Sequence, residues 1–260
     1  MNLIVAGHQR SGTTLLGRIC DGHPEISLTS EFANYTPMGR PYPSYMQRML
    51  RRMWQIRRRP GILPRGRQPG KWLRSYLFFT RYLLTIPPSL VEPVGPEVIG
   101  AVLHRLSPAA RFVGDKYPDY IFELPQFMEH PTIKWVVIYR DARDVASSTL
   151  IKARGDWRSA QFARQMDTPA KVAERWKQAV GIMESHKDSI FALRYEDLVQ
   201  QTQEQLARLG DWLGVDPAGF PIDSIRDASI GKHRDLLSGE ELRKVVEITG
   251  PTLERLGYAL

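Results

Sequence analysis

The segment Gly7–Thr14 (GHQRSGTT) constrains the fold of this chain more than any other. It follows a short apolar run, Leu3–Ala6, and precedes apolar residues that recur at helical spacing from Thr13 onward. Glycines at both ends let the loop turn so that successive backbone N–H groups point inward, and the positive end of the next helix faces the same space. The sequence therefore predicts a strand, an anion-binding loop and a helix that ends at Gly22.

This loop differs from that of nucleoside triphosphatases at one position. Their lysine neutralises the β- and γ-phosphates and would stand at position 13, where this chain has Thr13. The positive charge is instead Arg10, inside the loop, whose planar fork of donors suits an array of anionic oxygens. We expect anion binding by the loop residues Arg10, Ser11, Gly12, Thr13 and Thr14. A kinase or nucleoside triphosphatase with a lysine-less loop stays an alternative, with Thr14 and Asp115 imitating a magnesium site.

Strands and helices alternate along the rest of the chain. Ile133–Tyr139 has the clearest pattern of a buried strand, and Arg111–Gly114 and Ile190–Arg194 predict two more. This alternation predicts an α/β protein with a three-layer, P-loop-like fold and a central parallel sheet. We expect residues 1–260 to form a single domain, with 35–110 a basic, mostly helical insertion or lid.

Positive charge is concentrated in one block. The chain has 36 Lys and Arg against 28 Asp and Glu, yet residues 32–91 carry twelve basic residues and no acidic one. Three interpretations stay open: the block recognises an anionic ligand, it lies on an anionic membrane, or its aromatic residues form a core and its arginines face solvent. A nucleic-acid partner is not expected, because basic and aromatic residues do not interleave on strands.

Cysteine content and hydropathy limit the cellular location. The single cysteine, Cys20, excludes an intramolecular disulfide and a cysteine-based zinc site. No apolar segment reaches the roughly 18 residues of a membrane span. The start of the chain lacks the basic and apolar regions of a signal peptide. We therefore expect a cytoplasmic protein.

Two motifs resemble those of sulfotransferases that use 3′-phosphoadenosine 5′-phosphosulfate (PAPS). Arg10–Leu16 (RSGTTLL), followed by Asp21–Glu25 (DGHPE), is similar to their 5′-phosphosulfate loop, above all in the tyrosylprotein and glycan branch. Tyr139–Ser148 (YRDARDVASS) resembles their 3′-phosphate motif, with Arg140 and Ser148 at its spacing. The resemblance implies an enzyme that moves a sulfuryl group from PAPS to an acceptor hydroxyl and requires no metal.

Further matches are shorter. Tyr195, within Arg194–Leu198 (RYEDL), corresponds to a tyrosine that lies near the nucleotide in the family, although capping of the sheet edge would also explain it. Ile230–Arg234 (IGKHR) resembles the loop that closes over the nucleotide, but the tryptophan-containing pattern of the family is altered here. The resemblance offers Arg226 or Lys232 as a contact to the 3′-phosphate.

The resemblance also implies catalytic roles. In the tyrosylprotein branch the base is a glutamate 21 residues after the loop arginine, which here is Glu31. We expect Lys116 to contact the leaving oxygen and Arg10 to stabilise the transferring group. Alternatives are a surface or capping role for Glu31, and an ion pair of Lys116 with Asp115 or Asp119.

The acceptor is less defined. Family members that act on tyrosine have an arginine two residues after the glutamate, where this chain has Ala33. We expect a hydroxyl-bearing small molecule, glycan or lipid-linked acceptor, anionic if the basic block recognises it. A non-catalytic binder of nucleotides or anionic polymers is the remaining alternative, should Glu31 and Lys116 point away from the sulfate position.

Overall fold

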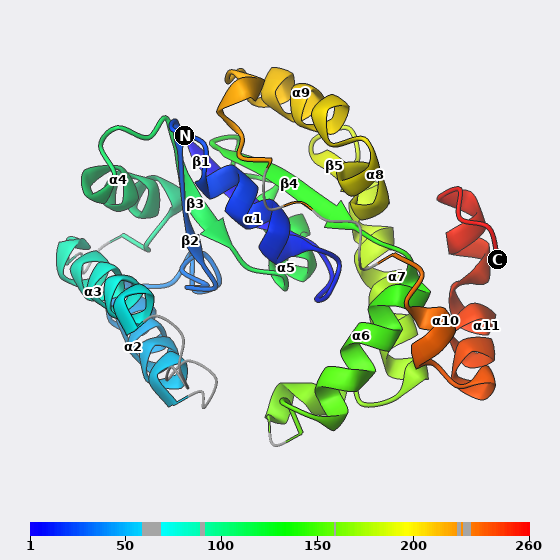
Figure 1. Cartoon of the computed structure of the whole chain (residues 1–260). Coiled ribbons are helices and arrows are strands. Elements are labelled where there is room, and N and C mark those ends of the chain that lie inside the picture. Colours follow the sequence, from blue (N-terminus) through cyan, green and yellow to red (C-terminus); the bar gives the residue numbers. More distant parts are fainter. Residues whose placement is uncertain (59–68, 89–91, 159, 223–224, 226–229) are drawn as a thin grey trace.

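The computed structural model describes residues 1–58, 69–88, 92–158, 160–222, 225 and 230–260, with the side chains of 56–58 and 69–75 left out. Its centre is a sheet of five parallel strands in the order β2-β3-β1-β4-β5 (Figure 1). The strands are β1 (Asn2–Ala6), β2 (Ile26–Ser30), β3 (Phe112–Lys116), β4 (Ile133–Tyr139) and β5 (Phe191–Arg194).

The strand order positions the phosphate loop. β1 is central, with β3 on one side and β4 on the other, so the chain order changes direction at β1. Crevices at such a switch point, beyond the carboxyl ends of the strands, are where α/β proteins bind ligands. Residues 7–12 follow β1 and therefore lie at this crevice.

Helices cover both faces of the sheet. Leu3 and Val5 point to one face, in a core shared with α1 (Thr13–Asp21), α8 (Tyr195–Gln200) and α9 (Thr202–Leu213). Ile4 and Ala6 point to the other, as the two-residue period of a strand requires, and meet the second core. That core includes α4 (Pro96–Leu106), α5 (Tyr120–Phe127), α6 (Ala142–Arg154) and α7 (Pro169–Ser185). The predicted three-layer α/β fold is confirmed.

The basic block contains two long helices in the part that the structure describes. α2 (Tyr42–Arg58) and α3 (Pro69–Thr85) lie side by side at one end of the molecule (Figure 1). Tyr45 and Tyr82 are buried, and their hydroxyls are 2.6 Å apart. Met49 and Phe79 join the same core. The inner faces of both helices are thus packed. That residues 1–260 form a single domain, with 35–110 as an insertion or lid, stays a prediction.

The last third adds α10 (His233–Leu236) and α11 (Gly239–Arg255) beside α6 and α7. The Ser238 hydroxyl accepts from the Glu241 N–H and the Glu241 carboxylate accepts from the Ser238 N–H, which is a capping box that starts α11. Within the described part of the chain, no helix is both long and apolar enough to cross a membrane.

Candidate active site

The phosphate loop needs its glycines for both conformation and space. Gly7 has φ 147°, and a Cβ there would lie 2.1 Å from the carbonyl oxygen of Ile138. Gly12 has φ 98°, and a Cβ there would lie 2.5 Å from the ring of Tyr195. L-residues with side chains rarely adopt such backbone angles. The loop therefore packs closely against β4 and against the residue after β5, with α1 starting at Thr13.

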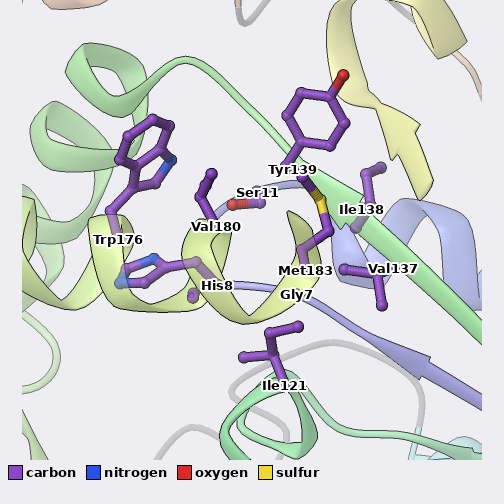
Figure 2. Close-up of a pocket in the computed structure, with 11 residues that line it drawn as sticks. Gly7, His8, Ser11, Ile121, Val137, Ile138, Tyr139, Trp176, Val180 and Met183 are labelled. Carbon is purple, nitrogen blue, oxygen red and sulfur yellow. The ribbon is translucent and has the colours of Figure 1, made fainter. Parts of the chain in front are cut away.

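Buried polar atoms lie beneath this loop. A cavity of about 10 Å³ lies between the loop, β4 and α7. Ser11, His8 and Trp176 are among the residues that line it (Figure 2). This volume suits a water molecule at most, so the cavity is not a nucleotide site. Burial lowers the pKa of His8 to about 4, which keeps its ring neutral near pH 7. The Ser11 hydroxyl is buried and has no hydrogen-bond partner among the described residues.

Arg10 is the cationic centre of the loop. Its φ is 70°, in the left-handed region, and its Nε donates to the Ser148 hydroxyl on α6 at 2.9 Å. Its carbonyl accepts from Arg140 Nη1 at 3.4 Å. Burial, and secondly the charge of Arg140, lower the pKa of Arg10. Two guanidinium groups close together at the end of β4 favour the binding of an anion between them.

Arg140 and Tyr195 complete this side of the site. The Arg140 guanidinium lies over the Tyr195 ring at 4.6 Å, and its Nη2 donates to Asp144 at 3.2 Å. The indole of Trp176 donates to the Arg140 carbonyl at 2.9 Å, which fixes the end of β4. The structure therefore brings together four predicted nucleotide contacts from different elements: Arg10, Arg140, Ser148 and Tyr195.

Asp144 connects this cluster to the C-terminal region. It accepts from the backbone N–H groups of Gly231 and His233 and from the His233 ring, at 2.8–3.0 Å. Burial alone would raise its pKa, but the hydrogen bonds from His233 and the nearby Arg140 outweigh burial and lower the pKa to about 2. Lys232 is exposed within this held segment, whereas Arg226 lies outside the described residues.

Glu31 and Lys116 meet at the carboxyl ends of β2 and β3. Ser30 pairs with Lys116 in the sheet register, so the next residue, Glu31, starts beside that lysine. Lys116 Nζ donates to Glu31 Oε1 at 2.9 Å, and the Glu31 N–H donates to the Lys116 carbonyl at 2.7 Å. The Lys116 side chain is 3 % exposed and that of Glu31 is 36 % exposed. Lys116 also lies against Gly17 of α1, where an added Cβ would be 2.8 Å from its Cγ.

The two acids near Lys116 in sequence have other partners. Asp119 accepts from Gln9 Nε2 at 3.2 and 3.3 Å and from Arg175 Nη2 at 3.0 Å. Asp115 is fully buried and accepts from two side chains and two backbone N–H groups. The ion pairs of Lys116 that the sequence left as alternatives are thus replaced by the pair with Glu31.

Asp115 is a residue of the candidate site that sequence analysis assigned to a hypothetical magnesium site or to an ion pair with Lys116. The backbone donors are Phe32 (3.3 Å) and Ala33 (2.8 Å), and the hydroxyl donors are Thr29 (2.7 Å) and Tyr120 (2.9 Å). With four donors on its carboxylate, Asp115 holds the turn after β2 rather than a cation. In the sequence, the one indication of this role was that Asp115 directly precedes Lys116 at the end of a predicted buried strand.

The turn that Asp115 holds is strained. Glu31 has φ 61° and Ala33 has φ 54°. Together with Arg10, they are the residues other than glycine with left-handed φ in the described part of the chain. Such conformations cost about 1–3 kcal/mol each and are typical of functional sites. Here all three flank the candidate site.

Arg52 is a second residue that sequence analysis did not identify. From α2, its Nη2 and Nε donate to the Glu31 carbonyl at 2.8 and 3.2 Å. Its guanidinium also lies 5.1 Å from the centre of the Tyr117 ring. One arginine of the basic block is therefore committed to the site, and nothing in its sequence context distinguishes it from its neighbours.

Comparison with known proteins identifies the family. Residues 2–218 match the model of the sulfotransferase family. The chain belongs to this family. The enzyme class expected from the sequence is confirmed with it. No curated protein matches the sequence of this sulfotransferase.

Solved structures agree on the fold. The sulfotransferase domain from the curacin biosynthetic pathway has a TM-score of 0.57 and 17% identity, over 100% of this chain and 98% of that one. Sulfotransferase STF9 from Mycobacterium avium has a TM-score of 0.53 and 14% identity, over 100% and 77% of the chains. Mouse sulfotransferase SULT7A1, solved with PAP, has a TM-score of 0.52 and 13% identity, over 97% and 84%. At these identities the likeness concerns the fold.

Proposed function

We propose that this sulfotransferase transfers the sulfuryl group of PAPS to an acceptor hydroxyl by in-line displacement. The observation that carries the proposal is the ion pair of Glu31 and Lys116. It lies at the carboxyl ends of the parallel strands, where the phosphate loop also lies. A carboxylate and an ammonium group beside an anion-binding loop are what displacement at a charged group requires.

The residues of the site fit the proposed donor. Arg10 lies close to Arg140, whose charge lowers the Arg10 pKa, and α1 starts directly after the loop at Thr13, so an anion placed here would face two guanidinium groups and a helix N-terminus. Arg10, Thr13 and Thr14 would hold the 5′-phosphosulfate with backbone N–H groups. Arg140 and Ser148 would hold the 3′-phosphate, and Tyr195 would line the nucleotide site. The bound donor supplies an activated sulfuryl group.

Glu31 acts as the base. Its carboxylate takes the proton of the acceptor hydroxyl as the acceptor oxygen bonds to sulfur and the bond from sulfur to the 5′-phosphate oxygen breaks. The strained backbone of Glu31 is held by Arg52 from one side and through the turn by Asp115 from the other. The carboxylate is therefore positioned before substrate binds.

Lys116 and Arg10 supply positive charge. An ammonium group has three N–H donors, and Lys116 gives one to Glu31 at 2.9 Å. We propose that another reaches the departing phosphate oxygen, where negative charge develops. Arg10, whose pKa is lowered by burial and by Arg140, gains an anionic partner when the donor binds. A lysine-less kinase is disfavoured because the Asp115 carboxylate already accepts four hydrogen bonds.

Calorimetry tests the donor site. Adenosine 3′,5′-bisphosphate should bind with micromolar affinity, Arg140→Ala should abolish that binding, and ATP with magnesium should bind weakly or not at all. Arg143→Ala serves as the matched control, because Arg143 is paired with Asp141 and lies three residues after Arg140, in the first turn of α6. Tight, magnesium-dependent ATP binding with no bisphosphate binding would overturn the proposal.

Labelled donor then tests the chemistry. Acceptor hydroxyls of small molecules, glycans and lipids are screened for incorporation of label. Glu31→Gln should lower turnover roughly 100-fold or more while bisphosphate binding is retained. If Glu31→Gln transfers label as fast as the wild type, Glu31 is not the base.

A further inference from the structure

The outward face of α2 mixes apolar and basic side chains. Gln47, Leu50, Arg51 and Trp54 follow the i, i+3, i+4, i+7 spacing of one helix face, and all four are exposed. Leu50 is 43 % exposed and Trp54 is 51 % exposed. The opposite face of α2 is buried at Met49, so this helix has one packed side and one outward side.

The outward face of α3 has the same character. Leu77, Arg81 and Leu84 follow the i, i+4, i+7 spacing, and all three are exposed. Leu77 is 52 % and Leu84 is 81 % exposed, whereas Phe79 and Tyr82 on the opposite face are buried. α3 packs beside α2 (Figure 1).

Charge distinguishes this surface from an ordinary solvated one. Residues 32–91 contain no Asp or Glu, so no carboxylate from this segment neutralises the arginines of α2 and α3. An anionic glycan or an acidic protein segment would use the arginines but would leave Leu84 and Trp54 in water. An anionic bilayer uses both kinds of side chain, because phosphates lie above acyl chains.

We propose that the outward faces of α2 and α3 bind the surface of an anionic lipid bilayer. The apolar side chains enter the headgroup region and the arginines lie on lipid phosphates. This lipid-binding face consists of Arg48, Leu50, Arg51, Trp54, Leu77, Arg81 and Leu84. The inference goes beyond sulfuryl transfer and does not depend on it.

The bilayer would then lie close to the base. Arg52 lies on α2, which contributes part of the lipid-binding face, and its side chain contacts the Glu31 carbonyl. Glu31 is therefore about one helix diameter, roughly 10 Å, from the face. This arrangement favours acceptor hydroxyls presented at a membrane surface.

Vesicle co-sedimentation of the full chain, without donor or acceptor, tests the proposal. Phosphatidylcholine vesicles are compared with vesicles that also contain phosphatidylglycerol, at low and high salt. The protein should sediment with the anionic vesicles, less so at high salt. Leu50→Ser with Trp54→Ser, Leu77→Ser with Leu84→Ser, and Arg48→Gln with Arg51→Gln should each lower the partition coefficient roughly ten-fold.

Two further variants separate lipid binding from misfolding. Gln47→Leu adds an apolar side chain to the same exposed face and should raise partition roughly three-fold. Ile151→Ser with Leu236→Ser removes exposed apolar side chains elsewhere, 47 % and 42 % exposed, and should leave partition unchanged. The proposal is overturned if the wild type does not sediment with anionic vesicles, or if Ile151→Ser with Leu236→Ser lowers partition as much as the variants of the lipid-binding face do. Retention of the protein on a heparin column, without sedimentation with vesicles, would also overturn it and would assign the arginines to an anionic glycan.

Discussion

The guanidinium of Arg52 donates two hydrogen bonds to the main-chain carbonyl of Glu31, at 2.8 Å from Nη2 and 3.2 Å from Nε. Arg52 is on α2 and Glu31 follows β2, so the contact joins the basic helix to the candidate base. Glu31 has a left-handed backbone, φ 61°, which needs support from outside its own turn. Arg52 is therefore a positioning residue for Glu31.

Replacing Arg52 by Gln should lower kcat strongly and should leave the affinity for the donor nucleotide almost unchanged. Without the guanidinium fork the Glu31 backbone relaxes, and a displacement of about 1 Å at a base costs roughly 100-fold in rate. The Kd of adenosine 3′,5′-bisphosphate should stay within about two-fold, since Arg52 contacts Glu31 and Tyr117 rather than the phosphate loop. Turnover with a screened acceptor and calorimetry give the two values. Arg40→Gln, at an exposed arginine of the basic block outside the lipid-binding face, should keep kcat. An equal loss of kcat there would attribute the effect to a general loss of positive charge.

Replacing Gly17 by Ala should impair Lys116. In an ordinary helix this change stabilises by about 0.5–1 kcal/mol. Here the new Cβ would lie 2.8 Å from Cγ and 3.1 Å from Cβ of Lys116, so the lysine side chain must move, which disturbs its hydrogen bond to Glu31. We expect a lower kcat with no gain in the free energy of unfolding. Steady-state kinetics and urea unfolding measure both.

Gly181→Ala is the matched control for Gly17→Ala. Gly181 lies within α7, and a Cβ there has no neighbour within 4 Å. This variant should be more stable by about 0.5–1 kcal/mol with unchanged kcat. If Gly17→Ala is also more stable with unchanged kcat, α1 and Lys116 do not pack as closely as described.

Local patterns predicted where Arg10 and Arg140 lie in the fold. The strand Ile133–Tyr139 was predicted with its observed bounds, because seven consecutive mostly apolar residues are typical of a strand buried on both faces. The residue after it, Arg140, necessarily lies at the carboxyl edge of the sheet. The loop arginine is at the same edge because β1 pairs with β4. Motif and local strand together therefore placed Arg10 and Arg140.

The base side depends on contacts between distant segments. β2 was not predicted, since three of its five residues (ISLTS) are polar and its neighbour in the sheet, β3, is about 85 residues away. Asp115 and Arg52 act on backbone groups of the turn at Glu31–Ala33, and a sequence pattern gives no information on such partners.

Glu123 should make stability depend on pH. Burial, with a smaller contribution from Asp119, raises the pKa of this carboxyl to about 7 from 4.5. Between these values the folded protein keeps the proton and the unfolded chain loses it. The free energy of unfolding therefore falls as pH rises from about 4.5 to about 7 and then levels off.

Glu123→Gln should remove that dependence. Its amide oxygen can still accept from Thr36, which donates to Glu123 Oε1 at 3.1 Å. The variant should exceed the wild type by about 2 kcal/mol above pH 7 and match it near pH 4. Urea unfolding across this range measures the difference, with the exposed Glu129→Gln as control. A difference that stays constant with pH would contradict the raised pKa.

Asp144→Asn should loosen the nucleotide site from its C-terminal side. An amide cannot replace the charge that Arg140 and His233 contact at 3.2 and 2.8 Å. We expect the Kd of adenosine 3′,5′-bisphosphate to rise roughly ten-fold, because Arg140 and the segment with Lys232 lose a shared anchor. Calorimetry measures this, and Asp156→Asn, at an exposed pair with Lys152, should leave the Kd unchanged.

The same variant has a signature in pH that a general packing defect lacks. The folded pKa of Asp144 is lowered to about 2 from 3.8, so its charge stabilises the fold fully above about pH 4 and less as pH falls towards 2. The wild type should therefore exceed Asp144→Asn by about 1–2 kcal/mol near pH 7, and this gap should narrow on acidification. A gap that stays constant down to pH 3 would mean that Asp144 acts through shape rather than charge, and His233 would then not depend on it electrostatically.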